Sequence, residues 1–251
     1  MSTAVVSFPD VVARLVGVEG WLSHDQAEAL YQLAAACRAG ERIVEIGSFR
    51  GRSTIVIAAA AADGVEIVAI DPHAGNDRGP QEISGLEQQA QEDLVAFERN
   101  LTAAGVRDRV RHVRAFSDDA HGAVDDPIQF LYIDAAHRFG PAIADIRDWG
   151  SRVADGGTLA IHDAFSSVGV TLAICRELML GRRFRYVRRE RSLAIFEADL
   201  APGARACLAN AARQFVQLGW FVRNVALKAA LSAGWGKFCR RIGRDVPEWP
   251  Y

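Results

Sequence analysis

The sequence predicts an α/β fold of the Rossmann-like kind, with a seven-stranded, mostly parallel sheet, helices on both faces, and helical additions at the N- and C-terminal ends. Three observations support this. Short apolar runs alternate with longer segments of helical periodicity, as in strands joined by crossover helices. A glycine-containing turn at 47–51 joins the first run to an alanine-rich segment. Several runs are followed by acidic residues, and ligands bind outside the carboxyl ends of parallel strands.

Composition limits the kind of protein. The chain has 251 residues, 50% hydrophobic and 24% charged, which suits a soluble globular protein with one α/β domain and additions. A net charge of −2 argues against a dedicated nucleic-acid binder. The four cysteines form no C-x-x-C pair, so no zinc site or disulfide framework is indicated. Without a signal-peptide pattern or an apolar run of about 20 residues, we expect a cytoplasmic protein with no integral membrane association.

The elements follow in chain order. Residues 1–40 should form helices that pack on the core, since the S-x-x-Q pattern at 23–26 is a capping box and Gly40 ends the second helix. The core should span 41–199, and its last two strands form a hairpin. The predicted strands span 43–46, 66–70, 110–115, 128–134, 158–161, 184–188 and 192–197. The predicted helices span 11–16, 25–37, 53–62, 86–104, 119–124 and 141–149.

The turn after the first strand has the features of a nucleoside site. Gly47 and Gly51 let the backbone approach a ligand, and amides at the start of the next helix offer donors. Asp71, about 20 residues beyond the glycines, can accept from both ribose hydroxyls. The turn reads G-x-x-x-G and not the dinucleotide pattern G-x-G-x-x-G, so a nucleoside is favoured over a pyrophosphate. An ordinary strand–helix turn is the alternative.

A segment rich in Gly and Pro follows Asp71. We predict a lid loop over about 73–92, because a long loop at the carboxyl end of a strand is typical of a lid or binding loop. His73 could contact substrate there, or it is an exposed loop histidine without a role.

Two later strands bring further polar residues to the same edge. The apolar run 128–133 is followed by Asp134 and, three residues on, by His137. The next strand is followed by His162 and Asp163. Oxygen and imidazole groups in one cluster suggest a divalent cation. The alternative is that Asp163 caps the next helix and His137 only packs.

The turn, with Glu45 before it and Asp71 after it, resembles motif I of the class I S-adenosylmethionine-dependent methyltransferases. In those proteins the turn holds the methionine moiety and the acid holds the ribose. The resemblance implies that Ser117 and Asp118 contact adenine, although either could instead cap a helix at 119–124. The implied cofactor-binding residues are Glu45, Gly47, Ser48, Gly51, Ser53, Asp71, Ser117, Asp118 and Asp134.

Segments 131–149 and 156–164 resemble the metal-dependent sugar O-methyltransferases of the macrocin and mycinamicin type, which are relatives of cephalosporin hydroxylase-like proteins. A more distant resemblance is to the mycobacterial methyltransferases that build methylmannose polysaccharides. The first resemblance implies that Asp134 and Asp163 bind magnesium and that His137 is the base. His162 stands where an acid is usual, and as a third ligand it would tilt the preference from Mg²⁺ toward Mn²⁺.

Residues 200–251 form a separate helical extension. Apolar residues such as Leu208, Phe215, Leu218 and Phe221 recur at helical spacing, with basic residues between them. We expect this extension to pack on a neighbouring subunit or on the lid, which favours a homodimer. Weak adhesion to an anionic membrane ranks second.

The predicted function is transfer of a methyl group from S-adenosylmethionine to a saccharide hydroxyl, assisted by a divalent cation and a histidine base. The nearest alternative is a metal-free O-methyltransferase acting on a phenol or a carboxylate. An NAD-dependent oxidoreductase and a catalytically silent binding protein are the alternatives from other classes.

Overall fold

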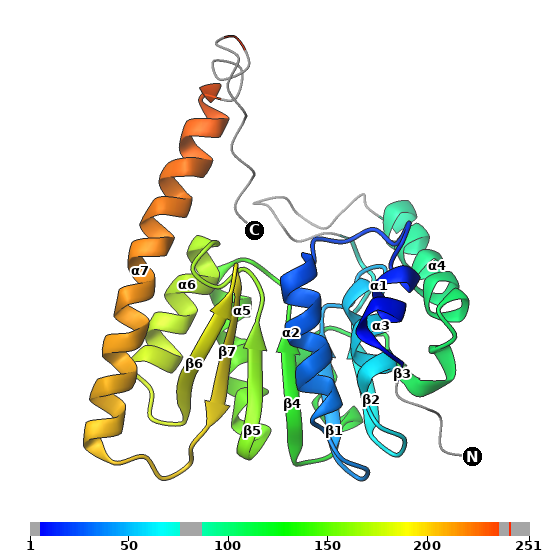
Figure 1. Ribbon diagram of the computed structural model, residues 1–251, viewed down its shortest axis with the longest axis horizontal. Coiled ribbons are helices and arrows are strands. Elements are labelled where there is room, and N and C mark those ends of the chain that lie inside the picture. Colours follow the sequence, from blue (N-terminus) through cyan, green and yellow to red (C-terminus); the bar gives the residue numbers. More distant parts are fainter. Residues whose placement is uncertain (1–5, 76–86, 236–240, 242–251) are drawn as a thin grey trace.

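The computed structural model describes residues 6–75, 87–235 and 241, and its described part forms a seven-stranded sheet in the order β3-β2-β1-β4-β5-β7-β6 (Figure 1). All neighbouring strands are parallel except β7, which runs antiparallel to both β5 and β6. The strands are β1 (Arg42–Ile46), β2 (Glu66–Ile70), β3 (Val110–Val113), β4 (Ile128–Ile133), β5 (Val153–Ile161), β6 (Phe184–Glu190) and β7 (Leu193–Ala198).

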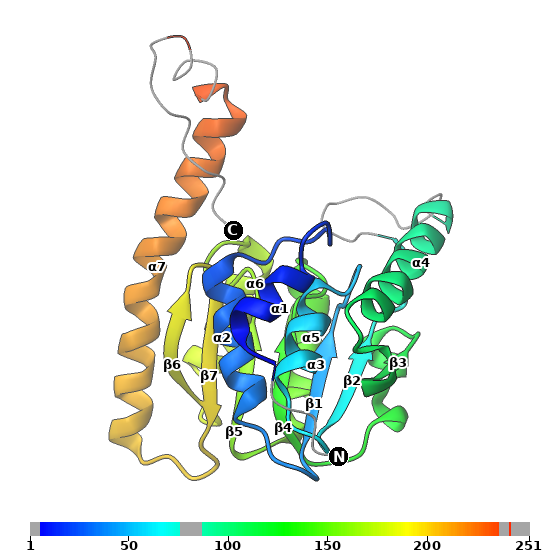
Figure 2. The same cartoon turned by 45° about the vertical axis from the view of Figure 1, so that its right-hand side comes forward.

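Helices cover both faces of the sheet, as Figures 1 and 2 show from two directions. Helices α1 to α4 pack on one face, and α5, α6 and part of α7 pack on the other. The two faces follow from the strand period of two: Ile43 points into the first core and Val44 into the second. The helices are α1 (Phe8–Arg14), α2 (His24–Ala35), α3 (Arg52–Ala60), α4 (Glu87–Ala103), α5 (Phe139–Asp148), α6 (Val168–Ile174) and α7 (Ala204–Ser232).

The local signals in the sequence place most elements correctly. The capping box is present: the Ser23 hydroxyl accepts from the Gln26 amide, and the Gln26 side chain accepts from the Ser23 amide. Several boundaries differ from the prediction, and helix α6 had no predicted range. The third strand ends at Val113, the helix predicted over 119–124 is replaced by two short 3₁₀ turns, and β5 begins at Val153. Ile128 of β4 pairs with Val153 and Phe130 pairs with Thr158, so β5 runs through its glycines across an irregularity in the register.

The predicted lid lies mainly outside the described residues, which omit 76–86. Its last part, 87–92, is helical and belongs to α4, so the predicted loop boundary at 92 is wrong. His73 is also not an exposed loop residue, because its side chain is only 1% exposed.

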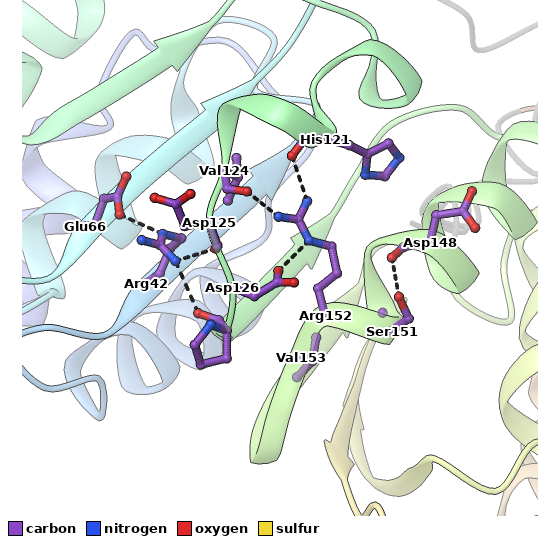
Figure 3. Close-up of polar contacts among 12 residues, drawn as sticks. Arg42, Glu66, His121, Val124, Asp125, Asp126, Asp148, Ser151, Arg152 and Val153 are labelled. Atoms are coloured by element: carbon purple, nitrogen blue, oxygen red, sulfur yellow. Dashed lines mark hydrogen bonds and ion pairs between the residues drawn. The ribbon is translucent and has the colours of Figure 1, made fainter.

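Arginine side chains hold the amino-terminal edge of the sheet together, opposite the edge that carries the strand-end acids (Figure 3). The Arg42 guanidinium, at the start of β1, donates to Glu66 of β2 at 2.6 Å and to the Asp125 carbonyl before β4. Arg152, just before β5, donates to the Asp126 carboxylate at 2.6 Å. These bonds connect the starts of four strands and leave the other edge available for a site.

Helix α7 lies along β6 and continues past the carboxyl ends of the parallel strands (Figures 1 and 2). Its inner face carries three buried amides, Asn210, Gln214 and Asn224. Asn210 accepts from the Tyr186 backbone amide at 2.7 Å, and Gln214 donates to the Leu178 carbonyl at 3.2 Å. The inner face of α7 therefore packs on this chain's own core.

The apolar residues predicted to form one packing face of the extension are divided between two faces. Leu218 and Phe221 pack partly on the core, whereas Leu208 and Phe215 are 73% and 67% exposed. Within the described ranges, no helix combines the length and the apolarity that a membrane crossing requires.

Candidate functional site

Four strand ends meet in a stepped arrangement at the carboxyl edge of the sheet. The Gly47 amide donates to the Ile70 carbonyl of β2 at 2.8 Å. The Asp134 amide donates to the last carbonyl of β1 at 2.9 Å, and the His162 amide donates to the last carbonyl of β4 at 2.9 Å. Each residue that leaves a strand is thus fixed by the neighbouring strand. The register of the parallel sheet places these side chains on one edge, as expected.

The turn after β1 requires its glycines. Gly47 has φ 85°, and a Cβ there would lie 2.3 Å from the Asp134 carbonyl oxygen. Gly51 has φ 84°, caps α3, and would place a Cβ 2.4 Å from the Leu101 side chain. Gly47 therefore lets the β1 turn approach the β4 end, and Gly51 lets α3 begin close to α4.

Asp71 organises the turn from the neighbouring strand. Its Oδ2 atom accepts hydrogen bonds from the Ser48 and Phe49 amides, each at 2.8 Å, and its Oδ1 atom accepts from the His73 amide at 2.7 Å. His73 is held in turn by a 2.9 Å contact from Nε2 to the Phe49 carbonyl. His73 therefore supports the turn, and it is also one of the residues that line the pocket above it.

Glu45 lies beneath the turn and does not line the pocket. Its carboxyl accepts from the Ser53 and Thr54 hydroxyls, each at 2.5 Å. Burial raises the pKa of Glu45 to about 8; the two hydroxyls oppose the shift, and the charges of Asp134 and Asp71 add to it. Because the side chain is 1% exposed, it carries a proton near neutral pH in this structure.

A pocket opens above the turn. Of the residues predicted to bind the cofactor, those that line it are Gly47, Ser48, Ser53, Asp71, Ser117, Asp118 and Asp134. Glu45 and Gly51 lie behind this lining. Ser117 does not cap a helix; its hydroxyl donates to Asp145 of α5 at 2.5 Å. Burial raises the pKa of Asp145 to about 6, against the effect of this hydrogen bond and with the charges of Asp118 and Asp148.

The predicted cation cluster is present as a geometric arrangement. Asp134, His162 and Asp163 each offer a ligand atom, and these atoms lie within 4.8 Å of one another. The Nδ1 atom of His162 is 3.2 Å from Asp134 and 3.7 Å from Asp163. The Nε2 atom of His162 is buried and makes no hydrogen bond, whereas its Nδ1 atom faces the two carboxylates. A donor set of two carboxylates and an imidazole nitrogen fits a divalent cation.

His137 joins this cluster through Asp163. Its Nε2 atom is 2.6 Å from the Asp163 Oδ2 atom, and both side chains are mostly buried. Asp163 does not cap the next helix, since the N-cap residue of α6 is Ser167. The backbone of Asp163 is left-handed, with φ 53°, and this directs the carboxylate back toward the two histidines.

Charge accounts for the protonation of the cluster. Burial lowers the pKa of His162, but the neighbouring Asp134 and Asp163 carboxylates outweigh burial and raise it to about 10. Burial raises the pKa of Asp163, whereas the His162 and His137 side chains lower it well below its ordinary value. Without a cation, the buried imidazolium of His162 supplies the positive charge that the two aspartates require.

Helix α7 reaches the turn that carries Asp163, a contact that the sequence did not reveal. Asn224 donates to the Phe165 carbonyl at 3.1 Å, and the Lys228 ammonium donates to the Ser166 carbonyl and hydroxyl at 3.1 and 3.0 Å. Phe165, like Asp163, has a left-handed backbone, with φ 54°. The C-terminal extension therefore stabilises a strained turn of the site.

The N-terminal segment also contributes to the pocket, which sequence reasoning missed. Trp21 lines it, and the ring centroids of Trp21 and Phe49 lie 5.5 Å apart. Arg138, next to His137, and Arg52 of α3 are further lining residues. The one available signal was an aromatic residue directly after Gly20, in the segment between the first two helices.

Comparisons with known proteins agree with this fold. Residues 44–164 match the family model described as a methyltransferase domain. Among solved structures, cofactor-bound Rv0187 from MTB has a TM-score of 0.58 at 21% identity, covering 77% of this chain and 91% of that one. The O-methyltransferase NovP has a TM-score of 0.57 at 16% identity, covering 70% and 80%. The O-methyltransferase TomG from Streptomyces achromogenes, in complex with SAM, has a TM-score of 0.50 at 19% identity, covering 81% and 92%.

Proposed function

We propose that this chain, which has the class I methyltransferase fold and carries a methyltransferase domain at 44–164, transfers the methyl group of S-adenosylmethionine to a saccharide hydroxyl. Two of the similar structures are named O-methyltransferases, and one of them is a complex with SAM. The observation that carries the proposal is the cluster of Asp134, His162 and Asp163, with His137 beside it and Asp134 also lining the pocket.

The donor occupies the pocket above the β1 turn. Gly47 and Ser48 lie against its methionine part, and Asp71 binds the ribose. The Oδ1 atom of Asp71 accepts a hydrogen bond from the His73 amide and retains a lone pair for a ribose hydroxyl. Ser117 and Asp118 line the part of the pocket that we assign to adenine. Ser53 lines the pocket, and its hydroxyl donates to the buried Glu45 carboxyl. Ser53 therefore links this acid to the binding site.

Asp134, His162 and Asp163 would hold a divalent cation, and when bound it would polarise the acceptor hydroxyl. Magnesium suits the two carboxylates, and the imidazole of His162 extends the choice to manganese. A saccharide fits this arrangement because its hydroxyls ionise too weakly to react unaided near neutral pH.

His137 receives the proton of the acceptor. As the oxygen–methyl bond forms, the bond from the sulfonium to the methyl carbon breaks, the hydroxyl proton moves to His137, and S-adenosylhomocysteine leaves. Asp163 orients the imidazole through the 2.6 Å contact at Nε2 and stabilises it once it is charged. Positioning of the two reacting groups supplies much of the remaining rate enhancement.

The same 2.6 Å contact favours one alternative. A His137–Asp163 pair could remove a proton without a metal, and the reaction would then be metal-free methylation of a more acidic hydroxyl such as a phenol. In that case the charged His162 would only neutralise the two aspartates.

The test is methyl transfer from labelled S-adenosylmethionine to panels of saccharides and phenols, with Mg²⁺ or with excess chelator. His137→Ala should lower turnover by about a hundredfold or more, because general-base catalysis contributes about 10² to 10⁴. Calorimetry with S-adenosylhomocysteine should show that binding is retained. His24→Ala is the matched control, because His24 is exposed on α2, away from the pocket.

The possible results separate the alternatives. Saccharide methylation that chelator abolishes supports the proposal. Full activity in chelator, with phenols preferred, would transfer the assignment to the metal-free enzyme. An undiminished rate in His137→Ala would show that the base has been assigned to the wrong residue.

A further inference from the structure

The outward face of α7 is apolar along much of its length. Four large side chains on it are mostly exposed: Leu208 is 73% exposed, Phe215 67%, Val216 71% and Val222 64%. Small exposed residues separate them, namely Ala212, Gly219 and Ala226. These positions recur at intervals of three and four residues, so they form one stripe opposite the buried amides of the inner face. From residue 208 to residue 226 the stripe is about 27 Å long, at 1.5 Å per residue.

Basic residues are concentrated in this C-terminal segment. Residues 200–244 contain eight Arg or Lys and no Asp or Glu. Residues 200–251 have a net charge of +6, while residues 1–199 have a net charge of −8. Arg205, Arg213 and Arg223 are exposed on α7, and Arg205 and Arg223, five turns apart, lie on one line at the border of the stripe.

We propose that the stripe of α7 binds an anionic lipid bilayer, with the helix lying in the membrane surface. The apolar side chains would enter the boundary between headgroups and acyl chains, and the flanking arginines would contact lipid phosphates. Figures 1 and 2 show that α7 forms one side of the molecule, and no other helix or strand of the described residues lies over its outward side. Neither the methyl donor nor the cation takes part, so this binding is independent of the proposed function.

A second copy of the chain fits the stripe less well. Two α7 helices packed through this face would bring their arginines together, and neither helix carries a carboxylate to offset them. Nucleic acid would account for the arginines but not for four exposed large apolar side chains between them. An anionic bilayer accounts for both features.

Vesicle flotation with the full chain tests this proposal. The protein should float with vesicles of phosphatidylcholine and phosphatidylglycerol, should not float with phosphatidylcholine alone, and should bind less as salt increases. The double variant Phe215→Ser, Val222→Ser should weaken binding by about tenfold or more, because two of the apolar side chains that would enter the bilayer are lost. Arg205→Gln with Arg223→Gln should weaken binding and flatten the salt dependence.

Two matched variants control for general effects. Leu180→Ser removes an apolar side chain that is 76% exposed but lies outside α7, and Arg38→Gln removes an exposed arginine near α2. Both should bind vesicles as the parent does, and circular dichroism should show all variants folded.

Three results would overturn the proposal. The first is no flotation with the anionic vesicles. The second is flotation that the stripe variants leave unchanged. The third is a concentration-dependent dimer, measured by sedimentation without lipid, that Phe215→Ser dissociates; this result would assign the face to a second copy of the chain.

Discussion

Glu45 offers the sharpest test of how burial sets the chemistry beneath the pocket. The change to make is Glu45→Gln, which keeps the shape of the side chain and removes the ionisation. The amide oxygen of Gln can accept from one of the Ser53 and Thr54 hydroxyls, and its NH2 group can donate to the other hydroxyl, as a protonated carboxyl does. Because burial raises the pKa of Glu45 from 4.5 to about 8, the folded protein holds a proton between these pH values that the unfolded chain has released. The stability of the parent should therefore fall as the pH rises through this window.

The magnitude follows from the shift. At about 1.36 kcal/mol per pH unit, a rise from 4.5 to about 8 makes the parent less stable by about 5 kcal/mol at pH 9 than at pH 4, from this group alone. The Gln variant lacks this loss. Other titrating groups are shared by the two proteins and cancel in the difference, so the variant should gain stability relative to the parent between these pH values.

Urea unfolding without S-adenosylmethionine, at several pH values from 4 to 9, measures the difference. Glu28→Gln, at an exposed position on α2, is the control and should follow the parent at every pH. A stability difference between Glu45→Gln and the parent that stays constant from pH 4 to pH 9 would refute the reasoning, because Glu45 would then not titrate in this window in the folded protein.

Three further predictions concern the two edges of the sheet. Gly47→Ala should weaken S-adenosylhomocysteine binding by about tenfold or more, about 1.4 kcal/mol. The reason is that the new Cβ would lie 2.3 Å from the Asp134 carbonyl oxygen, so the turn must shift. Calorimetry measures the affinity, and an unchanged value would contradict the prediction. Lys228→Met should lower kcat while leaving the KM for the methyl donor unchanged, because Lys228 holds the turn that carries Asp163. Lys228→Arg should restore part of the rate. A KM that rises as much as kcat falls would contradict this role and point to general disorder of the site. Arg152→Met should lower the free energy of unfolding by about 1 to 3 kcal/mol, because polar acceptors at the amino-terminal edge lose their donor. Urea unfolding measures this loss, and kcat of the folded variant should be unchanged.

The sequence determined the order of the elements and the edge on which the site lies. Hydrophobic period and glycine positions are local signals, so the strand at 66–70 was predicted to the residue and the capping box at 23–26 was identified. The placement of Asp71, Asp134 and Asp163 on one edge also followed, because parallel strands present their carboxyl ends on the same side. The family match at 44–164 covers the stretch from β1 to these three acids.

The tertiary structure decided which of these residues touch one another. Only the folded chain places Glu45 beneath the pocket with its charge suppressed, and only it pairs His137 with Asp163 at 2.6 Å. No periodicity or motif in the sequence signals either arrangement, because burial and pairing depend on residues that are far apart in the sequence. Helix α7 is the clearest case: its apolar residues predict a helix, but three amides that bond to distant carbonyls and amides decide which face packs inward. That choice turns Leu208 and Phe215 to the outside.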